Sequence, residues 1–123
     1  MNLVRGAAIF GFLGVALGAF GAHGLKARLG PEMLEIYKTG VLYHLLHALA
    51  ALAVALTGHR LPGRRVVVGL FMAGIVIFSG SLYALALTRV RILGAITPIG
   101  GVAFMAGWAV LVFWGESRSS QER

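Results

Sequence analysis

The sequence predicts an all-α membrane protein, a bundle of four transmembrane helices with a partly helical interfacial loop between helices one and two. Three observations predict this fold class. The 123 residues are 59% hydrophobic and only 12% charged, which is unlike the composition of a soluble globular domain. Four mostly apolar runs each approach the length of about 20 residues that spans a bilayer. The charged residues gather between these runs.

One domain accounts for almost the whole chain. The predicted helices are residues 3–22, 40–57, 66–88 and 92–114. Together they form a domain over residues 1–115, and a polar tail follows at residues 116–123. Four spans use up the length of this chain, so the sequence predicts no soluble catalytic domain.

The first apolar run has two interpretations. Arg5 before the run and small residues at its end are features of a secretory signal peptide. Small residues also fall in one stripe at helical spacing: Ala7, Gly11, Gly14, Gly18, Gly21 and Ala22. A helix that packs permanently against its neighbours needs such a stripe, whereas a cleaved segment does not. We therefore expect residues 3–22 to be a retained transmembrane helix.

The second apolar run, residues 40–57, orients the predicted bundle because its two faces differ. Wound as a helix, one face carries leucines: Leu42, Leu45, Leu46, Leu49, Leu52 and Leu56. The opposite face carries small residues and histidines: Gly40, His44, His47, Ala48, Ala51 and Ala55. The leucine face suits lipid, and the small face suits another helix. We therefore expect His44 and His47 to face inward.

Two prolines and a glycine predict local features of the backbone. Pro31 suits the first turn of a helix, so the second helix is expected to begin near Glu32, at headgroup level. Gly40 is a candidate bend. Pro98 cannot donate a backbone hydrogen bond, so a kink or an open turn is expected in the fourth helix.

Polar side chains within the apolar runs converge on one leaflet. Four crossings place the 23–39 connection and the 89–91 turn on the same side of the membrane. The polar residues near that side are His23, Tyr43, His44, His47, Ser79, Ser81, Tyr83 and Thr97. Such residues are costly in hydrocarbon and usually face a bundle interior or a wet cavity. We treat these eight residues as the candidate polar cluster.

The histidines of this cluster allow two interpretations. His44 and His47 lie three residues apart on one helix face and have the chemistry of metal ligands. The further donors available to a divalent metal are His23, Glu32 and Glu35. Alternatively, each histidine bonds a neighbouring carbonyl or tyrosine and fixes the helices together. We favour this second interpretation and expect no metal and no cofactor.

Glycines and serines in the apolar runs have structural interpretations. Small residues let helix backbones approach closely, so glycines at helical spacing are predicted packing positions. They are Gly11, Gly14, Gly18, Gly21, Gly69, Gly80 and Gly101. Ser79 and Ser81 are interpreted as helix hydroxyls that bond backbone carbonyls rather than as ligands.

The net charge of +7 does not indicate nucleic-acid binding. The basic residues lie at helix ends and in connections, where lipid phosphates sit, and not on a basic face interleaved with aromatic residues. With both termini inside, six lysines and arginines are cytoplasmic and five are outside. The positive-inside rule therefore favours cytoplasmic termini in the cell membrane. Membrane lipids are the expected partners.

Four motifs resemble one family of membrane proteins. They are GAFGAHGL at residues 18–25, YHLLH at 43–47, FSGSLY at 78–83, and ITPIGG at 96–101 with GW at 107–108. In kind and order they are similar to domain-of-unknown-function family 423, also called uncharacterised protein family 0382, a group similar to transmembrane protein 256. The resemblance spans all four helices. It implies a small multi-pass membrane protein of a family without an established biochemical activity.

Three classes of function are compatible with the sequence. The first is a non-enzymatic accessory or assembly component that works by helix packing, alone, as a homo-oligomer or with other membrane proteins. The second is a small-molecule or ion-handling protein that uses the polar cluster as an oligomer. The third is a redox or haem enzyme with His44 or His47 as axial ligand. No nucleophile–base pair, phosphate loop or carboxylate dyad is present, and no cysteine supports thiol chemistry. We expect the first class, keep the second as the alternative, and expect no enzyme activity.

Overall fold

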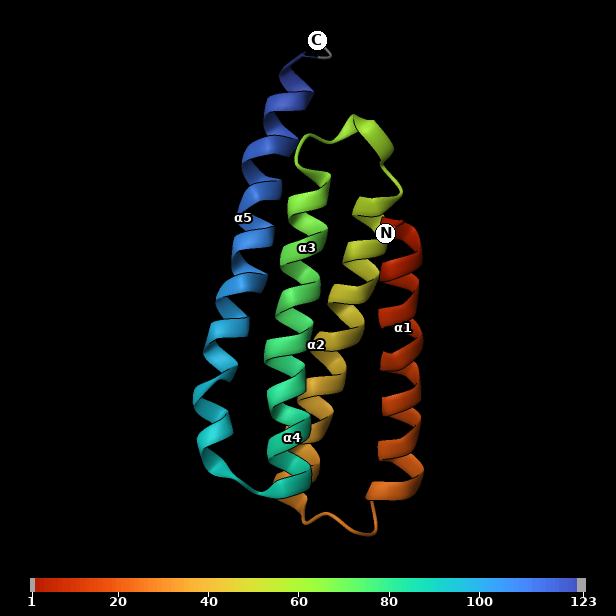
Figure 1. Cartoon of the computed structure of the whole chain (residues 1–123), viewed down its shortest axis with the longest axis vertical. Coiled ribbons are helices and arrows are strands. Elements are labelled where there is room, and N and C mark those ends of the chain that lie inside the picture. The colour runs from red at the N-terminus through yellow and green to blue at the C-terminus, as the bar shows by residue number, and fades with distance from the viewer. Residues whose placement is uncertain (1, 122–123) are drawn as a thin grey trace.

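A computed structural model describes residues 2–121, with residue 59 and residues 115–121 described by their backbone alone. Four long helices run antiparallel, and the start of α1 and the end of α5 lie at the same end of the molecule (Figure 1). The described part of the chain contains helices and turns and no strand. The predicted all-α fold class is confirmed.

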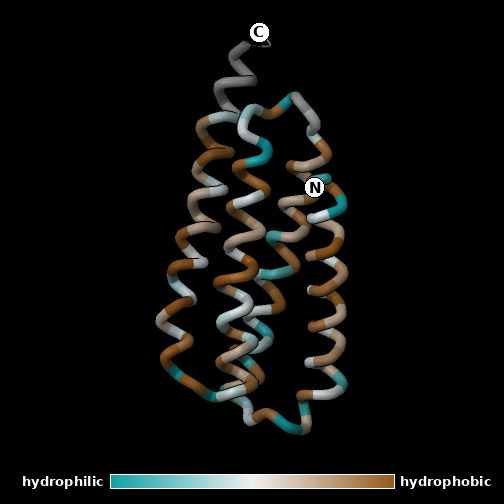
Figure 2. Tube along the Cα trace, in the orientation of Figure 1, coloured by the Kyte–Doolittle hydropathy of each residue, from teal (hydrophilic) through white to brown (hydrophobic). Residues whose placement is uncertain are grey.

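The described part of the chain contains nine helical segments, eight of which build the four long helices. They are α1 (Leu3–Phe20), η1 (Gly21–Leu25), α2 (Pro31–Ala55), η2 (Gly58–Arg60), α3 (Arg64–Gly74), η3 (Ile75–Ser79), α4 (Gly80–Thr88), η4 (Arg91–Ala95) and α5 (Thr97–Gln121). Of the short segments, η1 and η3 are π-helical, and η2 and η4 are 3₁₀-helical. Because η1 continues α1 and η3 joins α3 to α4, the chain has four spans long and apolar enough to cross a membrane. Hydrophobic residues dominate these spans, and hydrophilic residues concentrate at their ends (Figure 2).

Two helices form the centre of the bundle, and one outer helix packs against each of them. The α2 helix packs against the continuous helix formed by α3, η3 and α4, while α1 lies against α2, and α5 lies against α3 and η3 (Figure 1). Within the apolar part of each span, 39% of the residues are buried in Pro31–Ala55 and 44% in Arg64–Thr88. The corresponding share is 17% in each of the two outer spans. The outer spans therefore present most of their surface to lipid.

Two clusters of buried side chains hold the helices together. The larger cluster lies between α2, α3 and α5 and includes Phe71 and Phe104, with Val67 and Val68 fully buried. The smaller cluster lies where α1 and α2 are connected, around Tyr37. An ion pair of 3.3 Å between Arg91 and Glu32 joins the two connections at this end, as the four-crossing topology predicts.

The two predicted faces of the second helix are confirmed. Leu42, Leu46, Leu49 and Leu56 are exposed, and Gly40, His44, His47, Ala48, Ala51 and Ala55 are buried. Leu45 and Leu52 of the predicted lipid face are partly buried, since Leu45 packs against Gly14 of α1 and Leu52 packs against the larger buried cluster. The helix begins at Pro31, beside the expected Glu32. It continues through Gly40 without a break, so Gly40 is not a bend but a contact site for Tyr83.

The fourth helix differs from the expectation at both ends. The segment expected to begin at residue 92 is divided into η4 and α5. Because α5 begins at Thr97, Pro98 falls in its first turn, where a missing N–H costs no hydrogen bond and produces no kink. At the other end α5 is helical to Gln121, so the predicted tail begins as a continuation of this helix. Residues 122–123 of that tail lie outside the described residues.

The predicted packing glycines divide into two groups. Gly14, Gly18 and Gly21 meet α2, where a Cβ atom would lie within 2.3–3.2 Å of Leu45, Val41 and Tyr37 respectively. Gly101 is in loose contact with Phe78, at 3.8 Å. Gly11, Gly69 and Gly80 meet no other helix of this chain, since a Cβ atom at each would meet nothing within 4 Å. Helical spacing defines a face, but it does not show whether a neighbour covers that face.

Three glycines that were not singled out for packing allow α5 to approach the centre. A Cβ atom at Gly107 would lie 2.5 Å from Phe71, and one at Gly74 would lie 2.3 Å from Phe104. At Gly100 the nearest atom is the backbone nitrogen of Phe78, at 2.3 Å, which cannot move away as a side chain can. The contact between α5 and η3 therefore requires glycine at position 100.

We predict that Gly100→Ala lowers the free energy of unfolding in detergent by about 1–3 kcal/mol, the usual cost of overpacking. The matched control is Gly69→Ala, where the added methyl meets open space and alanine favours the helix by up to about 1 kcal/mol. Denaturant titration of both purified variants makes the comparison. Equal effects of the two substitutions would contradict the helix contact described here.

Candidate functional site

His44 connects α2 to two other helices. Its Nδ1 atom lies 2.8 Å from the Tyr83 hydroxyl on α4, and its Nε2 atom lies 2.8 Å from the Phe10 carbonyl oxygen on α1. A carbonyl only accepts, so Nε2 carries a hydrogen, and Nδ1 of the neutral ring accepts from Tyr83. The ring reaches α1 because Gly14 has no side chain, since a Cβ atom there would lie 3.1 Å from His44.

His47 connects α2 to α5. The Trp108 indole nitrogen donates to Nε2 of His47 at 3.0 Å, and Nδ1 lies 2.9 Å from the Tyr43 carbonyl oxygen. An indole N–H only donates, so Nε2 accepts and Nδ1 carries the hydrogen that bonds the carbonyl. The ring also stacks on Phe104, with 3.6 Å between centroids and 11° between planes. His44 and His47 are therefore opposite tautomers.

The hydroxyl residues of the candidate cluster lie around η3. Ser79 is fully buried and donates to the Gly40 carbonyl at 2.7 Å, which joins η3 to α2. Ser81 donates to the Phe78 carbonyl at 2.8 Å. Because this bond uses the hydrogen of the Ser81 hydroxyl, the Thr97 hydroxyl at 2.6 Å is the donor to Ser81. That second bond joins α4 to the start of α5.

The candidate polar cluster is not one site in this structure. Its members form four separate hydrogen-bonded groups, centred on His44, His47, Ser79 and Ser81. Tyr43 contributes its carbonyl to His47, while its ring is 39% exposed and packs on Phe78. His23 lies exposed in η1 and is not brought to the other histidines.

Sequence reasoning missed three partners of these groups. Trp108 is the donor to His47, and the signal for it was an indole N–H within an apolar run, where it needs an acceptor. Tyr37, which is not among the candidate cluster residues, is buried and donates to the Leu17 carbonyl of α1. The carbonyl of Phe10 has no signal in the sequence, because every residue supplies one.

The positions of His44 and His47 favour hydrogen bonds that connect helices over the coordination of a metal ion. Both ring nitrogens of His44 and of His47 are hydrogen-bonded, and a metal on His47 would have to displace the Trp108 indole. Among the described residues, no three histidine, aspartate or glutamate side chains gather as metal ligands do. Within the same residues, every buried side-chain nitrogen and oxygen has a hydrogen-bond partner.

One groove reaches the His44 group from the membrane. It lies between α1 and the η3–α4 segment and has a cavity volume of about 480 Å³. His44 and Tyr83 are the polar residues among its lining, which is otherwise apolar and includes Phe10, Val76 and Gly80. The Tyr83 oxygen, having donated to His44, retains capacity to accept a hydrogen bond.

Comparison with known proteins defines the class and the family of this chain. The family model described as "Protein of unknown function (DUF423)" matches residues 17–101. The UPF0382 membrane protein YwdK of Bacillus subtilis is 50% identical over 108 residues, covering 85% of this chain and 88% of the relative. The UPF0382 inner membrane protein YgdD of Escherichia coli K12 is 45% identical over 112 residues, covering 86% and 82% respectively.

The chain is therefore a multi-pass membrane protein, and it belongs to the DUF423 family. The predicted resemblance and the predicted membrane localisation are both confirmed. A UPF0382 membrane protein of Staphylococcus saprophyticus is a further relative, 46% identical over 106 residues that cover 85% of this chain and 88% of the relative. No solved structure matches the chain.

We predict that the Trp108–His47 bond contributes measurably to stability. Trp108→Phe and His47→Ala, alone and combined, should show a coupling free energy of about 0.6–2 kcal/mol, the range for hydrogen bonds between transmembrane helices. Denaturant titration in detergent micelles measures it. The control is Trp114→Phe, which removes an indole near the end of the span and should show no coupling to His47→Ala. Additive effects of the first pair would contradict the assigned bond.

Proposed function

We propose that this protein is a non-enzymatic membrane component that works by helix packing within a larger assembly. The observation that carries the proposal is the internal use of the polar groups, since all four ring nitrogens of the two α2 imidazoles are hydrogen-bonded, three of them to neighbouring helices. A catalytic or transport group must exchange its partners during turnover. Residues bonded in this way instead hold one helix arrangement, which suits a protein that presents a fixed surface.

The outward face of α3 supports a packing role. Val66, Gly69 and Ala73 of α3 and Val76 of the adjoining η3 share this face at helical spacing, and all four are exposed. A Cβ atom at Gly69 would meet nothing within 4 Å, so this glycine has no packing role inside the chain. Small residues on a lipid-facing helix allow a second helix to approach closely. We infer that this face receives a helix of another copy or of another membrane protein.

Cysteine cross-linking in native membranes tests this proposal, because the chain has no cysteine of its own. Gly69→Cys, labelled with a thiol-reactive photo-cross-linker and irradiated, should give a discrete covalent adduct, either with a second copy or with one other membrane protein. The control is Leu49→Cys on α2, which is 66% exposed on the face assigned to lipid and should give no such adduct. If both variants react alike, or Gly69→Cys gives no adduct, the packing proposal fails.

One observation favours the alternative, a small-molecule or ion-handling function. The groove between α1 and the η3–α4 segment contains His44 and Tyr83, so a ligand in the membrane has access to a polar pair. Such a ligand would have to offer a hydrogen-bond donor, because the Tyr83 hydroxyl has already donated to His44. We rank this function second because both nitrogens of His44 already have partners within the chain.

A further inference from the structure

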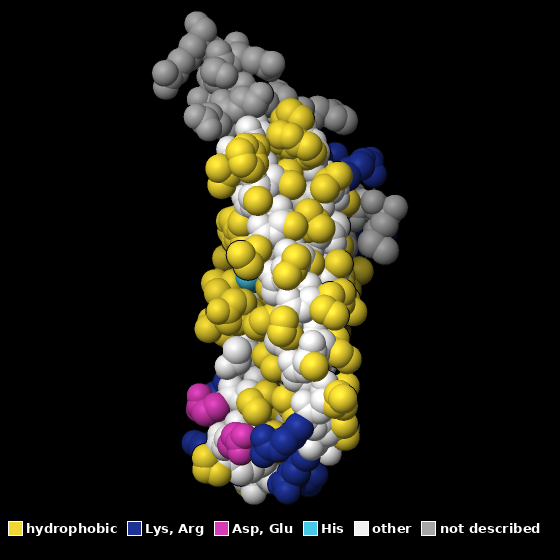
Figure 3. Space-filling model, turned by 90° about the vertical axis from the view of Figure 1, so that its left-hand side faces the viewer, with side chains coloured by type: hydrophobic (Ala, Val, Ile, Leu, Met, Phe, Trp, Pro, Cys, Tyr) yellow, Lys and Arg dark blue, Asp and Glu magenta, His cyan; other side chains and the backbone are white. Residues whose placement is uncertain are grey.

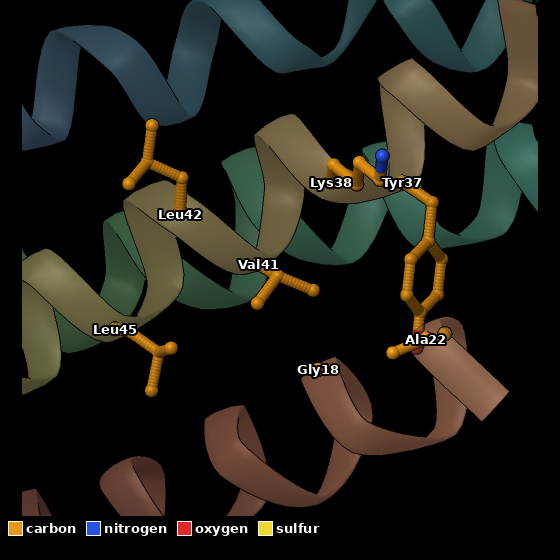
Figure 4. A pocket seen from close by; sticks show the side chains of 8 residues that line it. Gly18, Ala22, Tyr37, Lys38, Val41, Leu42 and Leu45 are labelled. Carbon is orange, nitrogen blue, oxygen red and sulfur yellow. The ribbon is translucent and has the colours of Figure 1, made fainter.

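A second groove lies between α1 and α2 on the lipid-facing surface. It has a cavity volume of about 270 Å³ and lies near the connection between these helices (Figure 4). Its lining residues are Gly18, Gly21, Ala22, Tyr37, Lys38, Val41, Leu42 and Leu45. Tyr37, Val41 and Leu45 point from α2 toward α1. The result is an apolar furrow between two spanning helices.

Lys38 is the charged residue of this groove. It lies about two turns inside the start of α2 and opposite the end of α1. Its side chain is 61% exposed and forms an ion pair of 3.6 Å with Glu35, which is 74% exposed. Exposed pairs of this kind are weak, and an ammonium has three hydrogens to donate. Lys38 therefore retains the capacity to bind a second anion.

The surrounding charge favours an anionic ligand over a zwitterionic one. Charged side chains gather at this end of the molecule (Figure 3). The basic residues of the two connections here and of the start of α2 are Lys26, Arg28, Lys38, Arg89 and Arg91, against two acidic residues, Glu32 and Glu35. The other polar side chain in the groove lining, the hydroxyl of Tyr37, already donates to the Leu17 carbonyl.

We propose that this groove binds an anionic phospholipid, with one acyl chain along Val41 and Leu45 and the phosphate at Lys38. The apolar lining of the groove suits the lipid's acyl chain, and the basic residues at its end suit the negative headgroup. A second copy of the protein is a poorer occupant, because a two-fold contact at this groove would bring two Lys38 side chains together. The proposal does not depend on the packing function proposed above.

Native mass spectrometry tests the site on protein released from vesicles of equal parts phosphatidylglycerol and phosphatidylcholine. The wild-type chain should retain phosphatidylglycerol in preference to phosphatidylcholine. Ala22→Leu should abolish that preference by filling the groove from an exposed position, and Lys38→Gln should abolish it by removing the ammonium. The thermal midpoint of each variant shows that the fold is retained.

Two matched controls distinguish a site from a general effect. Ala19→Leu adds the same bulk to an exposed position of α1 outside the groove, and Lys26→Gln removes a charge from the adjacent connection. Both variants should keep the preference for phosphatidylglycerol. The proposal is overturned if the wild-type chain retains both lipids equally, if either groove variant keeps the preference, or if the controls lose it to the same extent.

Discussion

Polar groups in the hydrocarbon region of a membrane need hydrogen-bond partners within the protein, and the arrangement of this bundle depends on that constraint. His44 and His47 lie on the buried face of α2 and use all four of their ring nitrogens in bonds. Three of those bonds reach other helices, to Phe10 on α1, Tyr83 on α4 and Trp108 on α5. The two histidines thus join every span of the molecule to α2.

These bonds require the helices to approach closely, and glycines make the approach possible. Gly14 leaves room for His44 against α1, Gly40 leaves room for Tyr83, and Gly107 leaves room for Phe71 beside α5. Each interhelical hydrogen bond contributes only about 0.6–2 kcal/mol, so close packing of the backbones supplies much of the stability. The hydrogen bonds add specificity, because rotation of α2 by one residue would break the three imidazole bonds that reach other helices.

Much of the fold could be predicted from the sequence, since the separation of leucines from small residues on α2 identifies its lipid face and its buried face. The partners of the histidines could not, because Trp108 lies 61 residues after His47 and spacing along one helix does not show which neighbour is within reach. For the same reason Gly14 and Gly69 look alike in the sequence, although one is packed and the other is open. The π-helical turns η1 and η3 also have no simple periodic signal in the sequence.

The tautomeric states of the two buried histidines test the connecting role of α2 most directly. Nitrogen NMR of the purified protein, labelled in its four histidines, distinguishes the two tautomers of each ring. Signals are assigned to His44 and His47 by their loss in His44→Gln and His47→Gln. The bonding described here predicts a hydrogen on Nε2 of His44 and on Nδ1 of His47. The same tautomer at both positions, or rapid exchange between tautomers at either, would contradict the account.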